Sequence, residues 1–128
     1  MKLLIDTHAA LWFLGGDPRL SIAARSAIED FGNERLFSIA CAWEIAIKVS
    51  LGKLDLHVSF DSLVPGQLEQ NGISLLPISP AHLRQVVRLP FHHRDPFDRL
   101  VIAQAVSEQA ALISADTKLD EYGIHRIW

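Results

Sequence analysis

Two aspartates directly follow short apolar runs that have the character of buried strands. Asp6 ends the run Leu3–Ile5, and Asp116 comes just after the run Ala111–Ser114. Continuous apolar runs of this length are typical of strands that are covered on both faces of a parallel sheet. Ligands bind such sheets at the carboxyl ends of the strands. Both aspartates are therefore expected at the ligand-binding edge.

Three further acids are expected at the same edge because they lie near the N-termini of helices that connect such strands. Glu44 lies near the start of the helix after the second predicted strand. Asp95 and Asp98 open the long helix that leads to the fourth strand. In a parallel α/β sheet, the strand ends and the starts of the following helices share one edge. Carboxylates from four parts of the chain are thus predicted to converge.

A gathering of bare carboxylates favours a metal ion. Neighbouring carboxylates repel one another, and each raises the pKa of the others. A divalent cation removes this repulsion, and Mg²⁺ prefers oxygen ligands over histidine or cysteine. The sequence therefore predicts a site for Mg²⁺, or for Mn²⁺, at this edge of the sheet.

Each of these acids also has a structural interpretation. Asp6, Asp95 and Asp116 each precede a predicted helix and can accept hydrogen bonds from its first N–H groups. Glu44 lies four residues before a lysine, the favourable order for an ion pair along a helix. For each of these residues alone, both interpretations stay open. Asp98 is explained least by capping, because a helix start needs only one acid.

Other catalytic chemistries find little support. Cys41 is the only cysteine, and its apolar neighbours favour a buried, inert thiol. The chain has no G-x-S-x-G elbow, no G-x-x-x-x-G-K-[ST] phosphate loop and no G-x-G-x-x-G motif. The adjacent His92 and His93 indicate a solvated loop, and the three tryptophans are expected in the core or at an interface.

The acids must be positioned by strands and helices that alternate along the chain. Strands are predicted at Leu3–Ile5, Arg35–Ser38, Ile73–Ile78, Ala111–Ser114 and Ile124–Ile127. Helices are predicted at His8–Leu14, after the cap Ser21, and at Ala40–Leu51, Asp61–Asn71, Ser79–Arg88, Asp95–Gln109 and Lys118–Tyr122. Pro65 is expected to split or shorten one of them, and Leu54–Val58 is ambiguous. This alternation predicts an α/β fold with a mainly parallel central sheet of four or five strands, flanked by helices.

Length and composition bound the class of protein. A chain of 128 residues, 49% of them hydrophobic, is expected to form one domain with its own core. A single cysteine excludes an internal disulfide. The 12 basic and 15 acidic residues give a net charge of -3, which excludes a strongly basic nucleic-acid binder. No signal peptide or membrane span is recognised, so a cytoplasmic protein is expected.

At the level of whole motifs, the chain resembles the PIN-domain ribonucleases of the VapC type, which are toxins of type II toxin–antitoxin pairs. The matching blocks are Leu3–Trp12, Ala42–Lys48, His93–Ala105 and Ile113–Asp116. They occur in the family's order and span almost the whole chain, although residues 54–77 carry no motif. The resemblance implies a single PIN domain over residues 1–128, with a PIN-like three-layer sandwich as its fold.

The resemblance also implies an activity and a ligand set. It implies a metal-dependent endoribonuclease that hydrolyses RNA phosphodiester bonds. The acids that match the family's set, as catalytic and metal-binding residues, are Asp6, Glu44, Asp98 and the more variable Asp116. Thr7 and Ser114 match hydroxyl positions that often accompany this set. Asp95 belongs to the Asp-Pro-Phe-Asp-Arg motif, where we interpret it as a helix cap first and a ligand second.

Partners follow from the same resemblance. It implies an RNA substrate, a cognate antitoxin that covers an apolar groove near the site, and a homodimer. No membrane partner is expected, because the sequence has no apolar stretch long enough to span one. Two bound divalent ions would change the net charge of -3 to +1, which suits an RNA substrate. The basic residues expected either to guide RNA or to pair with acids are Lys48, Arg94, Arg99 and Lys118.

Two alternatives belong to other functional classes. A phospho-acceptor receiver domain also has a strand-end aspartate, but it requires adjacent acids and a lysine after the last strand. Here Thr7 follows Asp6, and no lysine lies near Ile124–Ile127. A non-catalytic PIN-like interaction domain is the second alternative, and such domains usually lose acids that this chain has kept.

Overall fold

Short apolar runs form the strands of a five-stranded sheet in the computed structural model, which describes residues 1–128. The strands are β1 (Lys2–Ile5), β2 (Glu34–Ser38), β3 (Ile73–Leu76), β4 (Ala111–Ile113) and β5 (Arg126–Ile127). Every neighbouring pair is parallel, in the order β3-β2-β1-β4-β5. The central strands are buried on both faces, as continuous apolar runs predict. The predicted parallel sheet is confirmed, with five strands.

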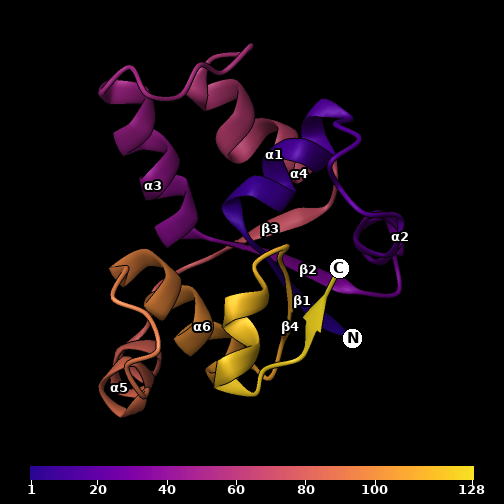
Figure 1. The fold of residues 1–128 in the computed structure, drawn as a ribbon. Coiled ribbons are helices and arrows are strands. Elements are labelled where there is room, and N and C mark those ends of the chain that lie inside the picture. The colour runs from indigo at the N-terminus through magenta and orange to yellow at the C-terminus, as the bar shows by residue number, and fades with distance from the viewer.

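Helices fill both faces of this sheet. They are α1 (Thr7–Gly15), α2 (Ile22–Glu29), α3 (Ile39–Ser50), the π-helical η1 (Ser62–Gln67), α4 (Leu68–Gln70), α5 (Pro80–Arg88), α6 (Pro96–Glu108) and the 3₁₀ segment η2 (Thr117–Tyr122). Figure 1 shows α1, α2 and α4 on one side of the sheet and α5 and α6 on the other, which makes three layers. None of these helices combines the length and the apolar character that crossing a membrane requires.

The order of the strands creates a switch point beside β1. The chain adds β2 and β3 on one side of β1, and then returns to add β4 and β5 on the other side. At the carboxyl end of β1, the N–H of Asp6 donates to the carbonyl of Ile113 over 3.1 Å, which ties the ends of β1 and β4 together. Ligand sites of open parallel sheets form at such a point.

Local capping signals set most helix boundaries where they were predicted. Gly16, at φ 64°, ends α1, and the Ser21 hydroxyl accepts the N–H of Ala24 at the start of α2. Ser79 caps α5, with proline as the first helical residue. Pro65 splits the expected Asp61–Asn71 helix, because Val64 before it has non-helical φ and ψ angles and the Val64–Pro65 bond is cis. The ambiguous segment Leu54–Val58 forms no regular element.

One helix presents a different face to the core than its large residues suggest. The spacing of Trp43, Ile47 and Leu51 puts them on one stripe of α3, but Trp43 and Leu51 are each 61% exposed. The core-facing residues of α3 are instead Ala40, Cys41, Ala42 and Ile45. The small side chains of the first three allow α3 to approach α1 and α6, both of which it contacts. Trp43 packs against Phe97 of α6, with ring centroids 5.3 Å apart.

Candidate active site

A cavity of about 280 Å³ lies at the switch point, at the carboxyl ends of β1 and β4. The structure brings all four predicted acids into its wall, together with Asp95; the four are Asp6, Glu44, Asp98 and Asp116. They come from the end of β1, from α3, from the first turn of α6 and from the segment after β4. The predicted convergence of these carboxylates is therefore present in the fold.

Asp6 combines a structural role with a place in the cavity. Its Oδ1 accepts the N–H of Ala9 over 2.8 Å, so the predicted cap of α1 is present. Burial raises the pKa of the Asp6 carboxyl, and the charge of Glu44 raises it further. The hydroxyl of Ser114 and the N–H of Ala9 partly offset this rise in pKa. Capping therefore does not remove the cost of a buried negative charge here.

Glu44 is oriented by two donors. Its Oε1 accepts the hydroxyl hydrogen of Thr7 over 2.8 Å, and its Oε2 lies 3.3 Å from the Nζ of Lys48. The ion pair along α3 that the spacing allowed is thus formed, and both of its members still line the cavity. Thr7 comes from the start of α1 and Glu44 from α3, so this hydrogen bond also joins two walls of the site.

The first turn of α6 holds two acids with different environments. Asp95 is the N-cap, and its Oδ1 accepts the N–H groups of Phe97 at 2.8 Å and of Asp98 at 3.3 Å. Asp98 has no ion pair and its carboxylate accepts no hydrogen bond from another residue. Burial raises the pKa of Asp98 to about 6, and the charges of Asp95, Glu44 and Asp116 add to this rise. Among the four acids, Asp98 therefore has the least compensated negative charge.

Asp116 completes the acidic wall after β4. Its Oδ1 accepts the N–H of Lys118 over 3.0 Å, which caps η2 as the sequence allowed. The N–H of Asp116 donates to the hydroxyl of the fully buried Ser114 over 3.2 Å. The two hydroxyl positions noted in the sequence, Thr7 and Ser114, therefore both contact the acidic cluster or its backbone.

The donor set of the cavity suits a hard divalent cation. Carboxylate and hydroxyl oxygens dominate its polar lining, and Lys48 is the one lysine or arginine among the lining residues. The raised pKa values of Asp6 and Asp98 are the condition that a bound cation relieves. No three His, Cys, Asp or Glu side chains already surround a common point at ligand distance. The metal role of the four acids stays a prediction.

The basic residues considered for RNA contact divide into two groups. Lys48 pairs with Glu44, as described, and Arg99 is only 6% exposed. The guanidinium of Arg99 donates to the carbonyls of Val86, Leu89 and Pro90, so it anchors the loop before α6. Its partners are carbonyls, and the expectation of an acidic partner or of RNA contact is wrong for this residue.

Arg94 and Lys118 are exposed on the protein surface, and neither side chain forms an ion pair. They flank the acidic cavity in the sequence, one residue before Asp95 and two residues after Asp116. Both remain available for a phosphate backbone.

The loop with adjacent histidines is packed rather than fully solvated. The N–H of His93 donates to the hydroxyl of Tyr122 over 2.8 Å, and the two rings lie 5.5 Å apart. Both ring nitrogens of His93 are buried and have no hydrogen-bond partner. The solvated-loop expectation is thus wrong for His93, because η2 covers it. Cys41 is buried as predicted, and burial raises the pKa of its thiol to about 12.

Comparisons with known proteins fit this geometry. The family model described as PIN domain matches residues 3–124. Ribonuclease VapC22 of Mycobacterium tuberculosis is 31% identical over 119 residues, which cover 91% of this chain and 88% of that protein. Ribonuclease VapC16 of the same organism is 41% identical over 69 residues, 51% of this chain and 49% of that protein.

Solved structures share the architecture at low sequence identity. A crystal structure of VapBC2 from Rickettsia felis, bound to a DNA fragment from its promoter, matches with a TM-score of 0.74 and 14% identity, covering 98% of this chain and 97% of that one. VapBC-1 from nontypeable Haemophilus influenzae matches with a TM-score of 0.67 and 17% identity, covering 98% and 96%. FitAcB from Neisseria gonorrhoeae matches with a TM-score of 0.64 and 14% identity, covering 97% of this chain and 95% of that one. The predicted three-layer α/β fold is confirmed.

Proposed function

The chain belongs to the PIN domain family, as a ribonuclease of the VapC type, and we propose that its acidic cavity hydrolyses RNA with the help of bound Mg²⁺ or Mn²⁺. The observation that carries this proposal is the meeting of Asp6, Glu44, Asp98 and Asp116 in one cavity at the switch point of the sheet. In this account the protein is the toxin of a toxin–antitoxin pair. The protein is proposed to act on RNA in the cytoplasm.

Metal ions bound by carboxylates lower the pKa of water and stabilise the charge that develops on phosphate oxygens. In the proposed site these ligands are the four acids of the cavity. Thr7 and Lys48 hold both oxygens of Glu44, and the N–H of Ala9 holds one oxygen of Asp6. Asp98 has no such partner and is free to turn toward a ligand.

The RNA backbone is proposed to enter past the exposed cations beside the cavity. Arg94 and Lys118 flank it in sequence and carry unpaired charges, which attract phosphate without selecting a base. Neither residue needs a fixed geometry for this role. Loss of either charge should weaken RNA binding at every sequence and reduce its dependence on salt.

The proposed antitoxin site is a second cavity of about 520 Å³ between α1 and the segment that follows α3. Its apolar lining includes Leu11, Leu14, Leu56 and Leu63, and His8 lines both this cavity and the acidic one. The structural neighbours VapBC2 and VapBC-1 support an antitoxin partner. An antitoxin segment seated here would lie next to the acids that it must control.

A homodimer is proposed through the exposed apolar side chains of α3 and α5. Large apolar residues are exposed on α3 and on or just after α5, namely Ile39, Trp43, Leu83, Val87 and Phe91. Both helices pack against α6. Light scattering of the parent and of Val87→Glu tests this proposal: a dimeric parent and a monomeric variant support it, and a monomeric parent contradicts it.

The activity is tested by RNA cleavage in Mg²⁺, in Mn²⁺ and in a chelator, with the parent, Asp6→Asn and Asp98→Asn. Asp61→Asn is the matched control, because Asp61 is exposed and its side chain caps no helix. Cleavage by the parent and the control that requires metal, and its loss in the two cavity variants, is the expected result. Metal-independent cleavage, or folded cavity variants that cut as fast as the parent, would contradict the proposal.

A further inference from the structure

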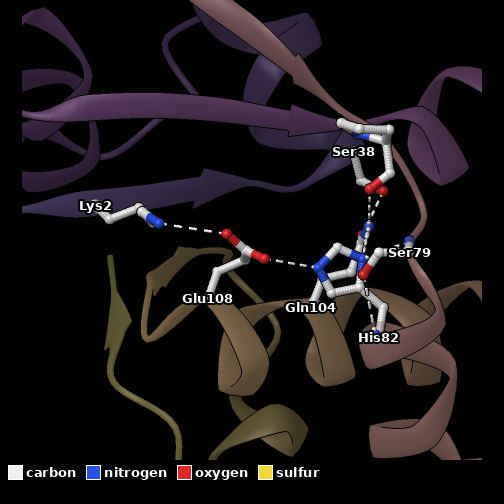
Figure 2. Close-up of polar contacts among 7 residues, drawn as sticks. Lys2, Ser38, Ser79, His82, Gln104 and Glu108 are labelled. Atoms are coloured by element: carbon white, nitrogen blue, oxygen red, sulfur yellow. Dashed lines mark hydrogen bonds and ion pairs between the residues drawn. The ribbon is translucent and has the colours of Figure 1, made fainter.

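A network of polar side chains joins α6 to its neighbouring elements (Figure 2), and none of its members lines the acidic cavity. We call it the His82 network. The hydroxyl of Ser38 bonds to Oε1 of Gln104, and Nε2 of Gln104 lies 3.3 Å from Nδ1 of His82. Nε2 of His82 lies 2.8 Å from Oε2 of Glu108, whose Oε1 is 3.3 Å from Nζ of Lys2. Ser38, His82 and Gln104 are almost entirely buried.

The direction of each hydrogen bond in the His82 network follows from two backbone N–H groups, one that donates to Ser38 and one that donates to His82. The hydroxyl oxygen of Ser38 accepts the N–H of Ala40, so its hydrogen points to Oε1 of Gln104. The amide group of Gln104 then faces Nδ1 of His82, which also accepts the N–H of Ser79 over 3.0 Å. Nδ1 therefore carries no hydrogen, and Nε2 carries the one that is donated to the carboxylate beyond it.

The His82 network joins the elements that carry three of the cavity acids. Ser38 is the N-cap of α3, the helix of Glu44. Gln104 and Glu108 both belong to α6, the helix of Asp98. Its last member, Lys2, belongs to β1, which leads into Asp6. A slide of α6 against the sheet would leave buried donors and acceptors without partners, which is unfavourable for each group.

A buried polar network fixes the register of packed elements, which an apolar contact of the same shape does not. Apolar residues stabilise a contact without defining its register, whereas a fully satisfied polar network accepts only one arrangement. Gln104 accepts from one element and donates to another, so it aligns α6 with α3 and α5 at once. The fixed register includes the distance between Glu44, six residues after the Ser38 cap of α3, and Asp98, in the first turn of α6.

We propose that Ser38, His82 and Gln104 are positioning residues that set the separation of Glu44 and Asp98 across the acidic cavity. The inference rests on the proposed function, because it takes that cavity to be the metal site. These residues act through the helices that they join, and they touch neither metal nor RNA.

Two substitutions of Gln104 separate positioning from stability. Gln104→Met removes the polar contacts, and Gln104→Glu keeps the shape but turns a second acceptor toward Nδ1 of His82. Val106→Ala, on the exposed side of α6, is the matched control. For folded Gln104→Met we expect a loss of kcat of about 10- to 100-fold, a small change in the KM for RNA, and Mn²⁺ binding weakened about 10-fold in calorimetry. The control should match the parent in all three.

The pH profile of Gln104→Glu supplies a readout that a merely structural role would not move. A proton on the introduced carboxyl restores a donor toward Nδ1, which faces only this side chain and the N–H of Ser79. Glu108, itself paired with Lys2, faces the other ring nitrogen. Burial and the facing acceptor raise the pKa of the introduced carboxyl. The kcat of this variant relative to the parent should therefore rise as the pH falls from about 8 to about 6, whereas the ratio for Gln104→Met should stay flat.

Failure of this proposal is distinguishable from failure of the proposed function. A parent that neither binds Mn²⁺ nor cleaves RNA would overturn both. A parent that does both, with folded Gln104 variants of equal kcat and Mn²⁺ affinity and no difference in pH profile, would overturn only the positioning role. Nitrogen NMR of the parent adds a test that needs no metal: the expected result is a hydrogen on Nε2 of His82, and a hydrogen on Nδ1 would overturn the proposal. If Gln104→Met does not fold, the pH profile of Gln104→Glu decides.

Discussion

The acidic cavity and the His82 network are both rich in polar groups, but these groups are paired in the network and repel one another in the cavity. In the network, the buried side chains of Ser38, Gln104 and His82 all have hydrogen-bond partners, and the hydrogen bond from His82 lowers the pKa of Glu108. In the cavity, like charges face one another, and burial raises the pKa of Asp98 to about 6. We interpret the difference as follows: the His82 network stabilises the fold, whereas the cavity keeps a repulsion between carboxylates that the proposed cation would remove.

The largest expected effect is the loss of activity when the least satisfied acid is changed. Asp98→Asn should lower kcat for RNA cleavage by roughly 10²- to 10³-fold, because it removes a proposed metal ligand. Asp95→Asn should be close to the parent, because asparagine caps a helix as well as aspartate does. Steady-state cleavage rates at saturating Mg²⁺ measure both. Equal losses in the two variants would make Asp95 a ligand as well as a cap.

A large effect on stability is expected at Arg99, which belongs to the satisfied part of the molecule. Arg99→Met leaves the carbonyls of Val86, Leu89 and Pro90 without their donor and should lower the free energy of unfolding by about 3 kcal/mol. Urea unfolding of the metal-free protein measures this change. A loss of RNA binding without a loss of stability would instead support the RNA contact that burial of Arg99 argues against.

Metal should stabilise the cavity by removing its repulsion. At a Mg²⁺ concentration about 100 times its dissociation constant, the free energy of unfolding should rise by about 2.7 kcal/mol. Thermal unfolding with increasing Mg²⁺ measures this rise, and Asp61→Asn should show it in full. Asp98→Asn should show much less of it. A rise of the same size in Asp98→Asn would mean that Mg²⁺ binds elsewhere.

Without metal, the charged Asp98 carboxylate should lower the free energy of unfolding, whereas bound Mg²⁺ raises it, and the effect is smaller. The folded protein holds the proton of Asp98 more tightly than the unfolded chain, in which this carboxyl has its ordinary pKa of 3.8. Stability of the metal-free protein should therefore fall as pH rises from about 4 to about 6, and the full cost is present above that range. Asp98→Asn should remove this cost and add on the order of 1 kcal/mol at neutral pH, after allowance for the partial exposure of the group. Urea unfolding in a chelator at several pH values checks the sign.

Local signals in the sequence predicted much of the fold and the members of the candidate site. Helix caps such as Ser21 and Asp95 act within three residues of their position, so the sequence displays them directly. The apolar run before Asp6 predicted a buried parallel strand for a similar reason. Once strand ends and helix starts were assigned, the topology of a parallel sheet placed the acids at one edge without further information.

Contacts between distant parts of the chain could not be predicted in this way. Ser38 and Gln104 are 66 positions apart, and nothing near either residue indicates the other. Arg99 looks like a surface cation in sequence, and only the loop folded over it makes it structural. The face that α3 turns to the core could not be predicted either, because small residues, which give a weak hydrophobic pattern, form its close contacts, while Trp43 packs against Phe97 at the surface.

The most direct test of the account is the titration of the Asp98 carboxyl carbon by NMR, with and without Mg²⁺. Without metal, the carboxyl should titrate near the raised pKa of about 6 that burial and the neighbouring acids impose. With saturating Mg²⁺, the apparent pKa should fall by more than one unit, because the cation favours the charged form. An Asp98 carboxyl that titrates near its ordinary value and does not respond to Mg²⁺ would contradict the claim that this cavity is built for a metal ion.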